Sequence, residues 1–194
     1  VYVPEIGTTA VDSGTKEHIG AVGESTIIDT VKYHNLVPGI EYTVKGVLMD
    51  KKTGESLTYD TSSADDSIVD AVVDAVTGNN KKTYTAEAKF TPTEADGTVS
   101  LEFKFNAPEG TDIVVFEELY YKEKLIAGHK DIEDKSQTVQ YPKIKTHATN
   151  KETGDKIIPS TGKVTIVDRV TYSNLIVGKE YTINGKLMDK ETGK

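Results

Sequence analysis

Short runs of β-branched and aromatic residues recur along the chain, and clusters of Gly, Asp, Asn and Pro separate them. Between the runs, Val37-Pro38-Gly39 and Pro108-Glu109-Gly110 have the composition of tight turns. This pattern is typical of an all-β domain, and we expect that fold class here. The runs predict strands at residues 6–11, 25–33, 41–50, 82–91, 97–106, 112–121, 124–130 and 137–141.

One stretch departs from the strand pattern. Between Ser63 and Val76 the apolar residues recur at helical spacing, behind candidate N-caps at Ser63 and Asp65. This spacing predicts a short helix within an insertion at residues 63–78. The many valines of the stretch would equally suit another strand, because β-branched side chains favour strands.

Internal repetition is the strongest sign of how the chain is organised. The repeated segments are residues 4–8 with 142–146, residues 26–29 with 165–168, and residues 41–50 with 180–189. This spacing of about 139 residues predicts one complete domain at residues 1–141 and the opening part of a second, truncated copy at residues 142–194. We expect the chain to be a fragment of a longer protein built from such repeats.

Several polar side chains are predicted to face the core. Alternate residues of a strand share a face, and Asp29 is in phase with the apolar residues Ile27 and Val31. A carboxylate on that face is costly unless a partner stabilises it. The same alternation predicts three further inward-facing polar side chains, namely Thr8, His129 and Gln137.

The alternation does not settle which of two neighbouring glutamates faces inward. Glu117 is in phase with Val115 and Leu119, whereas Glu118 is in phase with Phe116, and both faces of this strand are apolar. If a carboxyl at this position is buried beside Asp29, the two cannot easily both ionise and would titrate as a pair.

The charge balance and composition exclude several classes of function. The formal net charge of −8 leaves no basic excess for binding nucleic acid or an anionic membrane. There is no cysteine, so the chain has no disulfide and no thiol that could act as a nucleophile. No apolar run approaches the roughly 20 residues of a membrane span. The acidic runs at residues 65–66 and 131–135 lack EF-hand spacing, so we predict no metal site and no cofactor.

The order of several spaced motifs carries a resemblance to a known family. After the early pair Thr8-Thr9, the motifs are Ile-Ile-Asp-Thr-Val at 27–31, Tyr-Thr-Val-Lys-Gly-Val-Leu-Met-Asp at 42–50, Phe-Thr-Pro at 90–92, Val-Val-Phe-Glu-Glu-Leu-Tyr at 114–120 and His-Lys-Asp-Ile-Glu-Asp-Lys-Ser-Gln-Thr-Val at 129–139. In these motifs the chain resembles the Thr–Gln ester-bond domains of Gram-positive surface adhesins, whose repeats often carry a Val-x-Phe-Glu signature.

The resemblance implies a fold and a set of roles. The fold is an immunoglobulin-like β-sandwich, with an ester that ties the first strand to the last. Thr8 is implied as the nucleophile and Gln137 as the acyl donor. The implied catalytic residues are Asp29, Glu117 and His129. In the second copy only Thr146 and Asp168 match the motif positions.

The implied reaction is chemically reasonable. A threonine hydroxyl is a poor nucleophile at neutral pH, so a base such as His129 must take its proton during attack on the Gln137 carbonyl. A protonated carboxyl can then stabilise the oxyanion, and ammonia leaves. Each chain would react once with itself, so we do not expect a turnover enzyme. The product would gain mechanical, thermal and proteolytic stability.

The residues leave three other functions open. An isopeptide cross-link is one, although the first copy has no asparagine after Asn106 to act as a terminal-strand acceptor. A hydrolase using Thr8, His129 and Asp29 is another, although no glycine-rich nucleophile elbow is present. The third is a passive β-sandwich spacer without a cross-link.

The resemblance also implies a cellular setting. It predicts an extracellular, cell-wall-anchored surface protein, in which these repeats form a stalk. We expect a monomer whose partners are adjacent repeats of the same polypeptide, with any host-surface ligand bound by other domains. Neither nucleic acid nor a membrane is an expected partner.

Overall fold

The computed structural model describes residues 3–60, 76–77, 81–160 and 162–194. Within these residues the regular structure consists of β-strands and one 3-10 turn, with no α-helix. The prediction of an all-β fold is therefore confirmed. The helix predicted at residues 63–78 lies outside the described residues, apart from Val76–Thr77, which form the short strand β5.

The first layer of the fold is a three-stranded antiparallel sheet, here called sheet A. Its order is β1 (Glu5–Asp12), β2 (Gly23–His34) and β8 (Gly97–Ala107). The central strand β2 pairs Asp29 with Ala10 on one side and with Leu101 on the other. Asp29 therefore lies in the middle of this sheet.

The second layer is a five-stranded sheet, here called sheet B. Its strands are β7 (Thr85–Phe90), β3 (Tyr42–Asp50), β9 (Thr111–Tyr121), β10 (Lys124–His129) and β11 (Thr138–Tyr141). Strand β3 lies along one side of β9, while β10 and β11 follow one another along its other side. The turn η2 (Lys135–Gln137) precedes β11. The chain segment between β10 and β11 thus lies next to the Glu117 region of β9.

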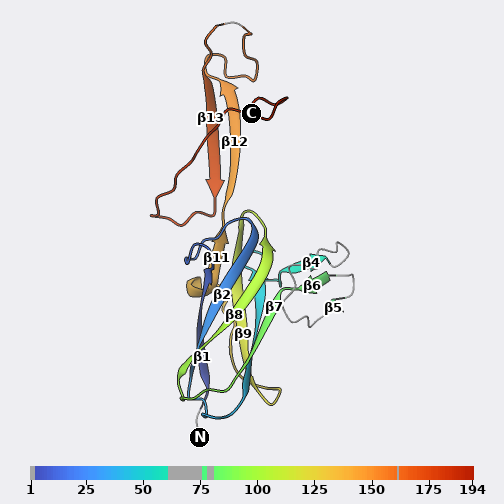
Figure 1. Ribbon diagram of the computed structural model, residues 1–194, viewed down its shortest axis with the longest axis vertical. Coiled ribbons are helices and arrows are strands. Elements are labelled where there is room, and N and C mark those ends of the chain that lie inside the picture. Colours follow the sequence, from blue (N-terminus) through green and yellow to red (C-terminus); the bar gives the residue numbers. More distant parts are fainter. Residues whose placement is uncertain (1–2, 61–75, 78–80, 161) are drawn as a thin grey trace.

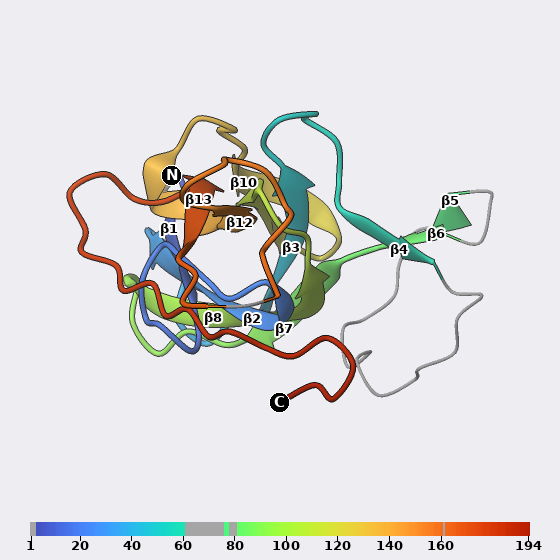
Figure 2. The ribbon, with the colours of Figure 1, turned by 90° about the horizontal axis from the view of Figure 1, so that it is seen from above.

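The two sheets stack face to face as an immunoglobulin-like β-sandwich (Figures 1 and 2). Alternation within each strand builds the core between them, as β8 shows: Leu101, Phe103 and Phe105 are at most 2% exposed, and Glu102 and Lys104 between them face solvent. Fully burying a side chain of this size stabilises a fold by about 1.5 to 3 kcal/mol.

Gly46 permits a close approach between the layers. A Cβ atom at this position would lie 2.6 Å from Cζ of Phe103 and 2.7 Å from Cδ1 of Leu101. Gly46 is also the cross-strand partner of Glu117. The absence of a side chain therefore lets the core of sheet A pack against the backbone directly beside Glu117.

A small three-stranded sheet stands apart from the sandwich (Figure 1). It contains β4 (Thr58–Asp60), β5 and β6 (Lys81–Thr83). The predicted strand at 82–91 is therefore wrong as a single element, because it divides between β6 and β7. Tyr84 at the division donates its main-chain N–H to the carbonyl of Leu57, outside the sheet B ladder.

Residues after Pro142 begin a second hairpin. It consists of β12 (Lys143–Asn150) and β13 (Ile166–Ser173), and it extends away from the sandwich beyond β11 (Figure 1). Ala148 pairs with Asp168 in the register in which Ala10 pairs with Asp29. No helix in the described part of the chain is long and apolar enough to cross a membrane.

Candidate functional site

Thr8 lies on the inner face of β1, as the alternation predicts. Its side chain is buried, and its Oγ1 hydroxyl donates to Oε2 of Glu117 at 3.2 Å. This hydrogen bond joins sheet A to sheet B, because Glu117 lies on β9. The hydroxyl therefore points at a carboxyl group from the opposite layer.

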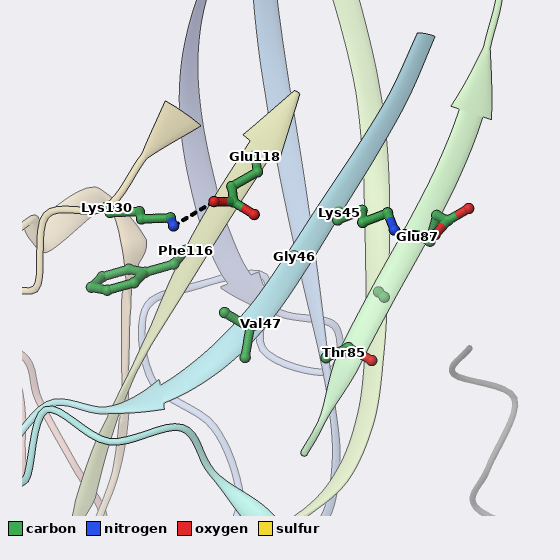
Figure 3. A pocket seen from close by; sticks show the side chains of 9 residues that line it. Lys45, Gly46, Val47, Thr85, Glu87, Phe116, Glu118 and Lys130 are labelled. Carbon is green, nitrogen blue, oxygen red and sulfur yellow. Dashed lines mark ion pairs between the residues drawn. The ribbon is translucent and has the colours of Figure 1, made fainter. Parts of the chain in front are cut away.

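The structure decides between the two glutamates of β9. Glu117 is fully buried, whereas Glu118 lies on the outer face of sheet B (Figure 3). There Glu118 forms an ion pair with Lys130 and accepts a hydrogen bond from the Tyr120 hydroxyl. The hollow of about 190 Å³ on this outer face is lined by such ion-paired residues, including Lys45 and Glu87. The buried chemistry is on the other face.

Asp29 and Glu117 form a buried carboxyl pair. Both side chains are 0% exposed. Burial raises the pKa of Asp29 to about 6, although the Glu117 carboxyl and the positive field of His129 oppose this rise. Burial also raises the pKa of Glu117, and the charge and hydrogen bonding of Asp29 raise it further. At neutral pH the pair therefore holds one proton, and Glu117 is the member that carries it.

His129 ends β10 and is the direct cross-strand partner of Glu117, so both side chains lie on the same face. The ladder shifts register between Leu125 and Ala127, and Leu125 is half exposed. Ala127 and His129, which follow this shift, are partly buried. A bulge changes the alternation that the prediction assumed.

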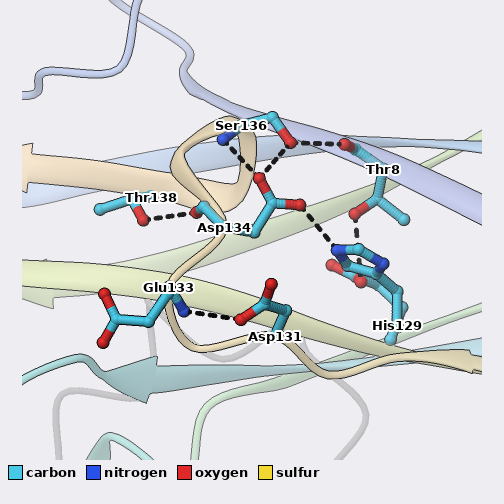
Figure 4. A network of polar contacts seen from close by, with 8 residues as sticks. Thr8, His129, Asp131, Glu133, Asp134, Ser136 and Thr138 are labelled. Atoms are coloured by element: carbon cyan, nitrogen blue, oxygen red, sulfur yellow. Dashed lines mark hydrogen bonds and ion pairs between the residues drawn. The ribbon is translucent and has the colours of Figure 1, made fainter.

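Asp134 orients His129, and the sequence prediction missed it. The imidazole Nε2 lies 2.8 Å from Asp134 Oδ2 (Figure 4). A carboxylate only accepts hydrogen bonds, so Nε2 carries the proton and Nδ1 is left as the basic nitrogen. Burial raises the pKa of Asp134, but hydrogen bonds from Ser136 and His129 outweigh it and keep the pKa below its ordinary value. Asp134 lies in the acidic run at 131–135, which has the composition of a solvated turn, so this composition gives no sign that the residue contacts His129.

Gln137 is the last residue of η2 and not the first residue of a strand, which corrects the prediction for 137–141. Asp134 caps this turn, because its Oδ1 accepts from the main-chain N–H of Ser136 at 2.7 Å. The turn still directs Gln137 inward, where it is 0% exposed. Neither atom of its amide makes a well-formed hydrogen bond to any residue that the structure describes.

The elements that carry the predicted residues of the first copy meet in one part of the core, here called the centre. β1 with Thr8, η2 with Gln137 and β9 with Glu117 all contact one another. The two oxygens of Asp29 also lack a well-formed hydrogen bond within the described residues. Such orphaned buried groups are rare and costly, and a catalytic role is one of the explanations for their presence. By contrast, Thr146 and Asp168 are exposed on the β12–β13 hairpin.

The described residues contain no group of three or more His, Asp or Glu side chains that could hold a metal ion. The chemistry available at the centre is that of a hydroxyl, a carboxamide, an imidazole and carboxyl groups. These groups can perform acyl transfer, in which the hydroxyl attacks the carboxamide carbon.

Comparison with known proteins places this centre in context. The T-Q ester bond containing domain family matches residues 4–141 and again residues 142–194. No curated protein matches the chain. A solved bacterial adhesin from Mobiluncus mulieris, which contains intramolecular disulfide, isopeptide and ester bond cross-links, is 14% identical, with a TM-score of 0.48 over 88% of this chain and 76% of its own.

A second crystal form of that adhesin gives a TM-score of 0.46, at 14% identity over 88% of this chain and 75% of its own. A glycosyl hydrolase family 2 member from Bacteroides cellulosilyticus is 12% identical, with a TM-score of 0.42 over 65% of this chain and 14% of its own. These solved structures are distant likenesses, whereas the family match spans both copies.

Proposed function

Because the chain belongs to the family of T-Q ester bond containing domains, we propose that its first repeat forms an internal ester between Thr8 and Gln137. The observation that carries this proposal is the buried Gln137 amide, which lacks a well-formed hydrogen bond among the described residues and belongs to a turn that contacts the strands of both Thr8 and Glu117. An unreactive core would gain stability by replacing such buried polar groups with apolar side chains. Their retention is explained if they react.

The proposed reaction is an acyl transfer that releases ammonia. His129 takes the proton of the Thr8 hydroxyl while Oγ1 attacks Cδ of Gln137, which gives a tetrahedral oxyanion. His129 then returns the proton to the departing amide nitrogen. The Cδ–Nε2 bond breaks, ammonia leaves, and the new bond joins Oγ1 of Thr8 to Cδ of Gln137. Each chain reacts once and is not regenerated, so this is not enzymatic turnover.

Each neighbouring group has a role that follows from its ionisation. Asp134 stabilises the imidazolium of His129 and fixes its tautomer. Glu117 holds a proton at neutral pH, so it can donate a hydrogen bond to the oxyanion. Asp29 is the charged member of the pair and keeps the proton on Glu117. Folding holds the reactants together, which can correspond to effective molarities of roughly 10⁵ M or more.

The product would be a covalently closed sandwich. The ester joins β1 to the turn before β11, and by analogy with a disulfide closing such a loop it stabilises the fold by about 4 to 5 kcal/mol. Load entering through β1 passes directly to β11 and then to β12. We propose that the chain is a stalk repeat of a cell-wall-anchored adhesin of a Gram-positive bacterium, working as a monomer with adjacent repeats of the same polypeptide as its partners.

Intact mass tests the proposal. The folded chain is expected to be about 17 Da lighter than its sequence requires, because one ammonia is lost. Thr8→Val keeps the shape of the side chain without the hydroxyl, and this variant should have the full sequence mass. Gln140 lies three residues from Gln137 and provides the matched control, so Gln140→Ala should still lose ammonia. A wild-type chain of full mass contradicts the proposal.

Hydroxylamine distinguishes the kind of cross-link. An ester is cleaved by hydroxylamine at mildly alkaline pH, whereas an isopeptide amide resists it. We expect the cross-linked chain to lose its compact mobility on a denaturing gel after this treatment. A mobility that hydroxylamine leaves unchanged would point to an amide and would exclude the Thr8–Gln137 ester.

A further inference from the structure

Ser136 lies between the residue that orients His129 and the residue that reacts. Its Oγ is 2.7 Å from Oδ1 of Asp134 and 3.3 Å from the main-chain carbonyl oxygen of Thr8 (Figure 4). Thr8 and Ser136 are 128 residues apart in sequence. This hydroxyl is therefore a polar link between the first strand and the turn that precedes the last strand.

The hydroxyl has one hydrogen to share between two acceptors. The Asp134 carboxylate already accepts from the main-chain N–H of Ser136 at 2.7 Å, so the cap of η2 persists without the hydroxyl. The contact that only the hydroxyl supplies is the one to Thr8. Loss of the hydroxyl would therefore loosen the turn from β1 while the turn itself remains formed.

We propose that Ser136 is a positioning residue for ester formation, because its hydroxyl ties the main chain of Thr8 to the turn that carries Gln137. This inference rests on the proposed function. The main-chain N–H and the hydroxyl of Ser136 both reach Oδ1 of Asp134, whose other oxygen contacts His129. Ser136 therefore lies where the first strand, the turn that carries Gln137 and the residue that orients His129 meet.

The energetic reason is the steep dependence of acyl transfer on geometry. Reacting atoms must be held about 3 to 3.5 Å apart, and a misplacement of about 1 Å can cost roughly a hundredfold in rate. Gln137 cannot be held by its own amide, which has no well-formed hydrogen bond to the described residues. Its position must come from neighbours, and Ser136 is the adjacent residue that contacts β1.

The test is the rate of ammonia loss in the full 194-residue chain. A short pulse of cell-free synthesis is followed by acid quenching at successive times, and the cross-linked fraction is read from intact mass. Ser136→Ala is expected to slow closure about five- to tenfold, the effect of losing one positioning hydrogen bond. Ser136→Thr restores the hydroxyl and is expected to react within about twofold of the wild-type rate.

Thr138→Val is the matched control. The Thr138 hydroxyl also bonds within this turn, to the main-chain oxygen of Asp134 at 2.7 Å, but it contacts neither Thr8 nor the Asp134 carboxylate. A variant that only weakens the turn should keep the wild-type rate within about twofold, even if its melting temperature falls as far as that of Ser136→Ala.

The results distinguish a failure of the Ser136 positioning role from a failure of the proposed ester. The positioning role is wrong if Ser136→Ala closes as fast as the wild type, if Thr138→Val is slowed equally, or if Ser136→Thr is as slow as Ser136→Ala. If the wild-type chain itself never loses ammonia, the proposed ester fails, and the Ser136 inference fails with it for that separate reason.

Discussion

Replacing Glu117 by glutamine separates the cost of the buried carboxyl pair from its role in the reaction. The substitution is made in a Thr8→Val background, which lacks the nucleophile, so no ester forms and unfolding can be measured reversibly. Burial, followed by the charge and hydrogen bonding of Asp29, raises the pKa of Glu117 from its ordinary value of 4.5 to about 11. Glutamine has nearly the same shape and never ionises.

The magnitude follows from the linkage between protonation and folding. At pH 7 the unfolded chain ionises Glu117, whereas the folded chain keeps it protonated. At about 1.4 kcal/mol per pH unit, the gap between 4.5 and 7 costs the folded state about 3 kcal/mol. Glutamine avoids this cost, because its amide stays neutral in both the folded and the unfolded chain. We expect E117Q to raise the free energy of unfolding by about 2 to 3 kcal/mol at pH 7.

The sign of the pH dependence is fixed by the same shifts. The folded pKa of Glu117 lies above the unfolded value, so its contribution to stability is present below about pH 4.5 and is lost as the pH rises toward 11. Asp29 acts in the same direction between its ordinary 3.8 and about 6. The Thr8→Val protein should therefore lose stability steadily above pH 4.5, whereas the double variant should change little above pH 6.

Urea unfolding followed by circular dichroism between pH 4.5 and 9 measures both quantities. A double variant that is no more stable than Thr8→Val at pH 7, or that keeps the same slope above pH 6, would refute the protonated Glu117. With Thr8 intact, E117Q should slow ester formation, because an amide N–H is a weaker donor to the oxyanion than a carboxylic acid O–H. The carboxyl pair would then be a case in which reactivity is retained at the expense of stability.

Three further variants test separate parts of the site and core. Asp134→Asn should slow ammonia loss by about a hundredfold or more, because the His129 tautomer is no longer fixed; wild-type kinetics would exclude this role. Gly46→Ala should lower the free energy of unfolding by about 1 to 3 kcal/mol, because its Cβ meets Phe103 at 2.6 Å, and urea titration checks this. Tyr141→Phe should lower the free energy of unfolding by about 1 kcal/mol, because the hydrogen bond at 3.0 Å between its hydroxyl and that of Ser25 is lost. Urea unfolding also measures this change.

The sequence predicts the site best where strands are regular. Thr8 and Asp29 lie on uninterrupted strands, so alternation alone places both side chains in the core. Alternation fails at Glu117 because β9 is apolar on both faces. For Gln137 it predicts the inward orientation correctly but the element wrongly, because Gln137 belongs to a 3-10 turn whose geometry Asp134 sets through its cap.

Asp134 itself could not be found from strand patterns. It lies in an acidic run, and its function depends on the approach of His129 from the preceding strand. A histidine followed five residues later by an aspartate, and three residues after that by the buried glutamine, is the signal that the sequence contains. This spacing becomes interpretable only in the fold, where β10 and β11 follow one another along β9 and the turn between them brings Asp134 to His129.

Peptide mapping of the folded wild-type chain tests the central claim most directly. After proteolysis, tandem mass spectrometry should find one branched peptide that contains both Thr8 and Gln137, with the mass of its two parts less one ammonia, about 17 Da. Two separate peptides, each with its full sequence mass, would contradict the ester.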